Sequence, residues 1–199
     1  MERTMEQHRV LCYGDSNTNG YDPRSCLGGR YPKSVRWTAL LEADGWKVFN
    51  EGQNGRCIPR RDLEITEAAQ KIHQSKAEIV IIMLGSNDLL QRPDLGAEGC
   101  AKRMEYFLAA LSQQPLVSFK TLLIAPPPMA PGAWVEDDRL LTESRRLSDY
   151  YGNLAQKMRI GFANAGSWGV GLSYDGVHFS EQGHRIFYEE ISKMLKAAI

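Results

Sequence analysis

The run Glu78–Leu84, which reads Glu-Ile-Val-Ile-Ile-Met-Leu, decides the fold class of this chain of 199 residues. It is rich in β-branched residues, it is almost wholly apolar, and Gly85 ends it. A continuous apolar run of this length is typical of a central strand in a parallel sheet, because helices cover both faces of such a strand. We therefore expect Glu78–Leu84 to lie in the middle of a mostly parallel sheet.

Shorter runs on either side of it also read as strands, and these are Arg9–Tyr13, Trp46–Asn50, Phe119–Ile124 and Gly161–Asn164. Segments with apolar residues at helical spacing separate them, namely Val35–Ala43, a helix beginning near Pro59, Ala97–Leu111 and Asp138–Met158. Ser180 can N-cap a last helix that runs to about Leu195. This alternation predicts an α/β protein, a three-layer α/β/α sandwich with a mostly parallel five-stranded sheet.

The composition is that of a globular protein, with 43% hydrophobic and 24% charged residues. Lys plus Arg and Asp plus Glu both number 24, so the formal net charge is zero. Nucleic-acid binders normally carry a basic excess or stripe, so this balance argues against a nucleic-acid partner. Because no repeat, low-complexity tract or interdomain linker is visible, we expect a single domain over residues 1–199, with Pro128–Asp137 as a surface loop.

Three sequence patterns are missing, and their absence predicts the location of the protein and the state of its cysteines. The polar first nine residues hold no apolar core of a secretory signal, and no stretch approaches the roughly 20 apolar residues that span a bilayer. We therefore expect a cytoplasmic protein with no membrane partner. The cysteines show no C-x-x-C spacing, which predicts free thiols and no structural zinc; they are Cys12, Cys26, Cys57 and Cys100.

Residues that follow the strands are the candidates for chemistry, because ligands of open α/β sheets bind at the carboxyl ends of the strands. Ser16 follows the first strand, and Asp175 and His178 lie in one loop near the C-terminus. A serine hydroxyl becomes a nucleophile when a neutral imidazole takes its proton, and a carboxylate fixes the tautomer of that imidazole. This chemistry suggests Ser16 as nucleophile, His178 as base and Asp175 as the orienting carboxylate.

Donors for the tetrahedral intermediate are available at the same edge of the sheet. Such an intermediate needs preorganised N–H groups aimed at its oxyanion. The backbone N–H of Ser16, the backbone N–H of Gly55 and the side-chain amide of Asn87 are the candidates. Gly55 permits close approach because it has no Cβ.

These segments carry a family resemblance. Gly14-Asp15-Ser16-Asn17-Thr18 resembles the first block of the GDSL/SGNH hydrolases, and Gly55 in Glu-Gly-Gln-Asn-Gly-Arg resembles the second. Gly85-Ser86-Asn87-Asp88 resembles the third block, and Asp175-Gly-Val-His178 the last. The four blocks occur in family order over nearly the whole chain. The resemblance implies a flavodoxin-like SGNH hydrolase fold and an esterase.

A narrower resemblance is to the arylesterase/acyltransferase branch of that family. It rests on Gly-Asp-Ser-Asn-Thr-Asn-Gly-Tyr-Asp-Pro, on the segment Arg30–Trp37, and on Ala-Pro-Pro-Pro. The branch acts on small acyl esters and tends to form oligomers, which implies a homo-oligomer here. Asn19 stands where many members carry an aromatic residue, so we expect a more polar acyl pocket.

The predicted reaction is hydrolysis of a small-molecule ester through an acyl-enzyme, with acyl transfer to an alcohol as a side activity and with no cofactor or metal. Carbohydrate O-acetyl esterase and lysophospholipase or thioesterase are alternatives that use the same residues. An inactive ligand-binding module is the non-enzymatic alternative, and a flavodoxin-like cofactor carrier leaves Asp175 and His178 unexplained. Trp134 is a candidate wall for the acyl or alcohol group and, equally, an oligomer contact.

Neighbouring polar residues have structural interpretations. Asp15 is predicted as a hydrogen-bonding turn residue, and Asp88 as a turn or helix-cap residue. His184, six residues after His178, is the rival base but lies within the last predicted helix, so we expect it to pack or to stabilise a cap. His8 and His73 are expected to be exposed.

Overall fold

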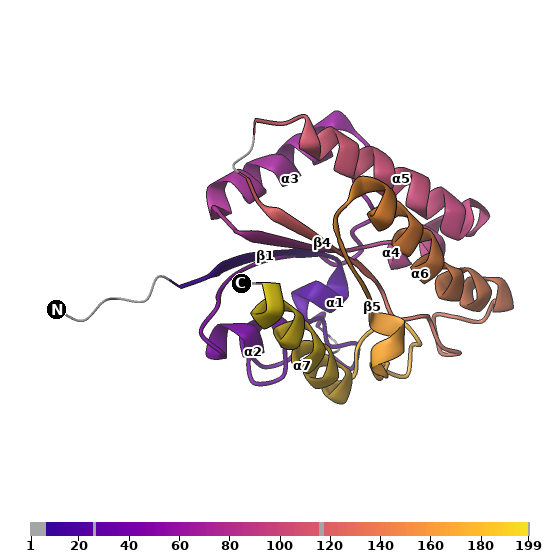
Figure 1. Cartoon of the computed structure of the whole chain (residues 1–199). Coiled ribbons are helices and arrows are strands. Elements are labelled where there is room, and N and C mark those ends of the chain that lie inside the picture. The colour runs from indigo at the N-terminus through magenta and orange to yellow at the C-terminus, as the bar shows by residue number, and fades with distance from the viewer. Residues whose placement is uncertain (1–6, 26, 116–117, 199) are drawn as a thin grey trace.

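The computed structural model describes residues 7–25, 27–115 and 118–198. Its centre is a five-stranded sheet in the order β2-β1-β3-β4-β5, and every neighbouring pair is parallel (Figure 1). The strands are β1 (Arg9–Gly14), β2 (Lys47–Gly52), β3 (Ile79–Met83), β4 (Lys120–Ala125) and β5 (Gly161–Asn164). The predicted fold class is confirmed, and β3, from the run Glu78–Leu84, is the central strand with every residue buried.

Helices cover both faces of the sheet. On one side lie α3 (Asp62–Ser75), α5 (Gly96–Ser112) and α6 (Asp138–Met158), and on the other lie α2 (Trp37–Ala43) and α7 (Glu181–Ala198) (Figure 1). Successive side chains of a strand point to opposite faces. Accordingly, Leu11 of β1 packs in the cluster under α3, α5 and α6, and Cys12 packs with Phe187 under α2 and α7.

Short helices stand at the carboxyl ends of the strands. They are α1 (Ser16–Asn19), α4 (Ser86–Gln91), and the 3₁₀ turns η1 (Pro93–Leu95) and η2 (Ala165–Trp168). The sequence placed Ser16 at a strand-to-helix turn, as found, whereas α4 was not predicted. The sheet order reverses between β1 and β3, so the chain leaves these two strands in opposite directions. Such a reversal opens a crevice at their carboxyl ends.

Two observed element boundaries differ from the predicted ones, and a local contact explains each difference. Strand β2 runs to Gly52 rather than Asn50, because its ladder with β1 continues until Gly52 lies beside Gly14. Helix α3 begins at Asp62 rather than near Pro59, because the Glu64 carboxylate accepts the N–H of Arg61 at 3.1 Å and caps the helix there.

Other expectations concern loops and thiols. The segment from Pro128 to Asp137 is an irregular loop, as predicted, and it hydrogen-bonds to residues 174–176. The described cysteines, Cys12, Cys57 and Cys100, are free thiols, while Cys26 lies outside the described residues. No helix within the described ranges is both long enough and apolar enough to cross a membrane.

Candidate active site

Ser16 is the first residue of α1, directly past the end of β1. Asp15 caps this helix, because its Oδ1 accepts the N–H of Asn17 at 2.9 Å, which confirms its predicted turn role. The helix ends after one turn at Gly20, in the left-handed region at φ 84°. A Cβ on Gly14 would lie 2.0 Å from Thr18 Oγ1, so only glycine lets α1 fold back onto β1. Ser16 is thus held at the strand end, 5% exposed.

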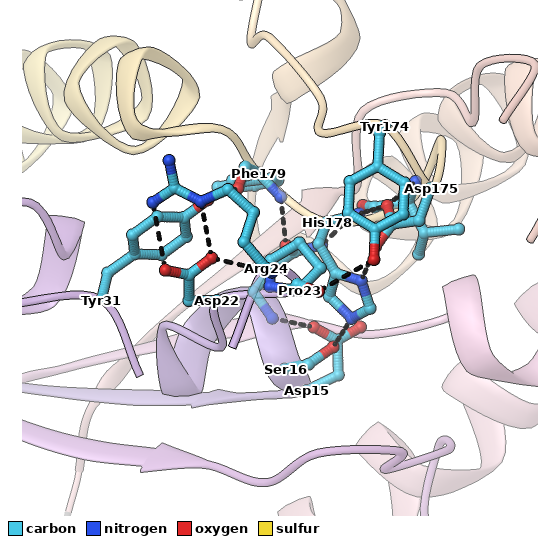
Figure 2. A network of polar contacts seen from close by, with 12 residues as sticks. Asp15, Ser16, Asp22, Pro23, Arg24, Tyr31, Tyr174, Asp175, His178 and Phe179 are labelled. Atoms are coloured by element: carbon cyan, nitrogen blue, oxygen red, sulfur yellow. Dashed lines mark hydrogen bonds and ion pairs between the residues drawn. The ribbon is translucent and has the colours of Figure 1, made fainter. Parts of the chain in front are cut away.

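His178 and Asp175 come from the loop that precedes α7. Asp175 Oδ1 accepts the backbone N–H groups of Val177 and His178, both at 2.9 Å. Its Oδ2 lies 2.6 Å from His178 Nδ1, and His178 Nε2 lies 2.9 Å from Ser16 Oγ (Figure 2). A carboxylate at Nδ1 accepts the proton on that nitrogen, which leaves Nε2 free to accept from the serine hydroxyl.

The pKa values of the two buried carboxylates of the site, Asp175 and Asp15, are shifted in opposite directions. Burial raises the pKa of Asp175, but the hydrogen bonds from the ring and backbone of His178 and from the N–H of Val177 outweigh it, so the pKa lies below 3.8. Burial raises the pKa of Asp15 to about 6, and the N–H of Asn17 and the positive charge of Arg56 only partly offset this rise. Asp175 is therefore held in its charged form, the form that orients an imidazolium.

Gly55 and Asn87 approach each other from the loop after β2 and from the start of α4. Gly55 has φ 75° and is exposed, and the next carbonyl, that of Arg56, accepts from Asn87 Nδ2 at 3.2 Å. Gln91 Nε2 donates to the Gly55 carbonyl at 3.2 Å. These bonds hold the loop against α4 with the positive φ that glycine adopts without strain.

The prediction of Asp88 as a turn or helix-cap residue is wrong, because Asp88 lies within α4. Its side chain is fully buried: Oδ2 accepts the N–H of Ile58 at 2.9 Å, and Oδ1 pairs with Arg103 Nη1 at 2.8 Å. Gly85 stands at the cap position of α4. Asp88 thereby ties the loop that carries Gly55 to the helix that carries Asn87, with partners 30 and 15 residues away in sequence that no local pattern reveals.

The Arg56 side chain fastens the same loop to β1. Its guanidinium donates to the Gly14 carbonyl at 3.0 Å and to the Glu51 carbonyl, and its carbon lies 4.3 Å from the centre of the Tyr13 ring. The contact with Tyr13 has cation–π geometry. A groove of about 590 Å³ opens beside this loop, and Gly55, Arg56 and Arg103 are among its lining residues.

Two aromatic rings lie close to the His178 ring. Trp134 lies 4.9 Å away between ring centres, edge to face, and it is 52% exposed. Tyr21, which the sequence analysis did not select, lies 4.8 Å away. Its position in the same quoted block as Ser16 was the signal that could have found it. The Asn19 side chain bridges α1 to the loop of Gly55, because its Nδ2 donates to Asn54 Oδ1 at 2.8 Å.

The remaining histidines have the expected roles. His184 is fully buried, its ring centre lies 5.2 Å from that of Tyr31 and 5.3 Å from that of Phe179, and burial lowers its pKa to about 3. It therefore packs, as predicted. His8 and His73 are exposed, also as predicted.

Comparisons with known proteins agree with this arrangement. The family model of the GDSL-like lipase/acylhydrolase family matches residues 12–186. A carbohydrate acetylesterase from Sinorhizobium meliloti is 27% identical, with a TM-score of 0.82 over 97% of this chain and 100% of that one. A putative arylesterase from Agrobacterium tumefaciens is also 27% identical, with a TM-score of 0.81 over the same shares.

The aryl esterase of M. smegmatis, at 24% identity, has the same fold, with a TM-score of 0.84 over 96% of this chain and 100% of that one. Among curated proteins, none matches the sequence. Since the family model spans well over half of its length, the chain belongs to the GDSL-like lipase/acylhydrolase family, and it is a carboxylic ester hydrolase.

Proposed function

We propose that this protein hydrolyses small acyl esters through an acyl-enzyme on Ser16, with His178 as the general base and Asp175 as its partner. The observation that carries the proposal is the unbroken chain of hydrogen bonds from Asp175 Oδ2 through the His178 ring to Ser16 Oγ. Three buried groups with mutually satisfying donors and acceptors are arranged to move one proton.

The reaction has two matched halves. His178 Nε2 takes the hydroxyl proton as Ser16 Oγ attacks the ester carbonyl carbon, and the carbonyl electron pair moves onto oxygen. When this intermediate collapses, the alcohol leaves with the proton from His178 and the acyl group stays on Ser16. Water, deprotonated by His178, then attacks the acyl-enzyme; as the acyl–oxygen bond breaks, the carboxylic acid leaves and Ser16 Oγ takes the proton back from His178. An alcohol in place of water gives a new ester, which is the acyltransferase activity.

The oxyanion of each intermediate is proposed to bind the N–H groups of Ser16, Gly55 and Asn87. The N–H of Ser16 is the first of α1 and has no partner within the helix. Asn87 Nδ2 uses one hydrogen for the Arg56 carbonyl, which fixes the amide plane and leaves its second hydrogen for the substrate. Preorganised donors of this kind are worth about 10²–10³ in turnover each.

We propose that the rings beside His178 and the polar bridge at Asn19 select the substrate. Trp134 forms the wall on the alcohol side, with an exposed indole face that suits a flat or ring-shaped leaving group. Asn19, bonded to Asn54, gives the acyl side a polar wall. A short acyl chain fits a polar wall better than a long apolar one does.

Acetylated carbohydrates are the second candidate substrates. The likeness to a carbohydrate acetylesterase and the Asn19–Asn54 bridge favour them. A panel of p-nitrophenyl esters of increasing chain length, acetylated sugars, thioesters and lysophospholipids separates the candidates by kcat/KM. Preference for long chains would replace the small-ester proposal with a lysophospholipase or thioesterase.

The central test is p-nitrophenyl acetate hydrolysis together with labelling by a fluorophosphonate. Wild type should turn over and carry the label on Ser16, and Ser16→Ala should lose both. An inactive binding module would show neither turnover nor label. Full turnover by Ser16→Ala would refute the mechanism.

Three organisational proposals accompany this function: a single domain over residues 1–199, a homo-oligomer and a cytoplasmic location. The half-exposed Trp134 and the 62% exposed Tyr174 support a contact between copies. Light scattering of the purified chain measures the assembly, and Trp134→Ser should dissociate it if Trp134 lies in the contact.

A further inference from the structure

Asn17 follows Ser16 directly, and its side chain reaches across to the loop of His178. The name of the family spells Gly-Asp-Ser-Leu, whereas this chain has an amide in the fourth place. Asn17 is only 4% exposed. A buried amide is retained at a cost unless it is hydrogen-bonded, so its partners indicate its role.

The partners of the Asn17 side chain bracket His178. Its Nδ2 donates to the carbonyl of Val177 at 3.1 Å, and its Oδ1 accepts the N–H of Phe179 at 2.8 Å. One amide thus clamps the residue before His178 and the residue after it. The imidazole between them points back to Ser16, the neighbour of Asn17.

The backbone of Asn17 is fixed as firmly as its side chain. Its N–H donates to Asp15 Oδ1 at 2.9 Å, and its carbonyl accepts from Trp37 Nε1 at 2.9 Å. Trp37 is completely buried at the start of α2. Asn17 therefore connects the serine turn, the helix layer beneath it and the histidine loop.

The hydrogen bonds of Asp175 have a different role from those of Asn17. They lie within the loop itself and set the orientation of the His178 ring. Within the described residues, the hydrogen bonds that join α1 to residues 175–179 are those of Asn17 and the Ser16–His178 contact. Other bonds to this loop come from Tyr31 and from residues 130–134, so Asn17 provides the direct side-chain connection between the loop and the helix of Ser16.

We propose that Asn17 is a positioning residue that sets the distance between Ser16 Oγ and His178 Nε2 by clamping the histidine loop onto α1. The proposal rests on the function proposed above. Asn17 touches no reacting atom and acts through His178. Since a displacement of about 1 Å at a reacting centre costs about 10²-fold in rate, the clamp has kinetic consequences.

Asn17→Leu is the test, because leucine has nearly the shape of asparagine but makes no hydrogen bond. With p-nitrophenyl acetate, we expect kcat to fall about 10²-fold and KM to stay within about threefold. A crystal structure of the variant should show the Ser16 Oγ–His178 Nε2 distance beyond hydrogen-bonding range. A kcat close to that of wild type, with the serine–histidine bond intact, would overturn the proposal.

Two further variants separate positioning from loss of fold. Asn17→Ala removes the same bonds without added bulk and carries the test if the leucine variant does not fold. Ser75→Ala is the matched control, because it also removes two buried hydrogen bonds to the backbone, with the Ile72 carbonyl and the Ala77 N–H. Ser75 is the last residue of α3 and lies before β3, at the end of the sheet opposite to the site. This substitution should lower the unfolding midpoint and leave kcat unchanged. Equal kcat losses in Ser75→Ala and Asn17→Ala would reduce Asn17 to a structural role.

The crystal structure of the Asn17→Leu variant also distinguishes a failure of this proposal from a failure of the proposed function. A wild type that neither turns over nor labels at Ser16 refutes the function. The clamp is then judged by the serine–histidine distance in Asn17→Leu alone, where an unchanged distance refutes it.

Discussion

The site has two halves that are built in different ways. On one side, Ser16 and His178 are each at most 5% exposed and are held by hydrogen bonds among residues that are themselves buried. On the other side, Gly55 is exposed on a loop and Asn87 is half-buried. That loop is held from behind by charged residues, Arg56 and the Asp88–Arg103 pair.

This difference follows from what each half has to do. Proton transfer needs a distance held to a few tenths of an ångström, which a close-packed interior provides. Oxyanion binding needs donors that can face a substrate, and of the proposed donors Gly55 lines the open groove beside its loop. We therefore expect the loss of a Ser16, His178 or Asp175 side chain to remove nearly all activity, and substitutions in the exposed half to remove only part of it.

The largest effect is expected for Asp175→Asn, which changes the buried half without changing its shape. The asparagine oxygen can still accept from Val177 and His178 backbone N–H groups, but its amide would donate to His178 Nδ1. That contact stabilises the tautomer with a proton on Nε2, which cannot accept from Ser16. We expect kcat to fall about 10⁴-fold with p-nitrophenyl acetate. A loss below tenfold would remove Asp175 from the mechanism.

The exposed half should lose less when Asn87→Ala removes its side-chain donor. We expect kcat to fall about 10²–10³-fold with little change in KM, because the donor acts on the charged intermediate. Gln91→Ala is the comparison, since this exposed amide donates to the Gly55 carbonyl and is not among the proposed oxyanion donors. Steady-state kinetics of both variants check the order. A larger loss in Gln91→Ala would place the oxyanion donors elsewhere.

Sequence reasoning found the candidate groups of both halves and missed the residues that hold them in place. Ser16, Gly55 and Asn87 closely follow β1, β2 and β3, and parallel strands bring their carboxyl ends to one edge of the sheet, so their approach was predictable. Asp175 and His178 lie in the loop before α7, and the chemistry that a serine nucleophile needs linked them to Ser16. Helix α6 was also predicted with its observed bounds, because a 21-residue amphipathic pattern leaves little freedom.

The supports of the site were not predictable in this way. Asn17 bonds to residues 160 and 162 positions away, and Asp88 bonds to Ile58 and Arg103 across two elements. Turn propensity, the signal used for Asp88, describes local backbone preference and contains nothing about a distant partner. Single-sequence patterns thus find the groups at strand ends and miss what holds them.

A smaller effect, on stability, is expected for Asp15→Asn in the buried half. The raised pKa of Asp15, about 6 against 3.8, means that its contribution to stability is full below about pH 3.8 and is lost as pH rises through about 6. Asparagine keeps the cap on α1 without ionising. At pH 7.5 the variant should be more stable than wild type by roughly 3 kcal/mol, and near pH 4 the difference should vanish. Urea unfolding at both pH values measures this; a pH-independent difference would contradict it.

The smallest effect is expected for Gly55→Ala in the exposed half. A Cβ at Gly55 would meet no atom within 4 Å, so the substitution tests only the backbone conformation at φ 75°. A left-handed conformation costs an alanine about 1 kcal/mol, which corresponds to at most about tenfold in kcat if the loop relaxes away from the oxyanion. Gly55→Asn should lose less, since asparagine tolerates this region. Gly52→Ala is the contrast, because its Cβ would lie 2.1 Å from the backbone nitrogen of Asn19 and would push β2 away from α1. If Gly55→Ala lost as much activity as Gly52→Ala, the loop would be as rigid as the buried half, and the distinction between the two halves would fail.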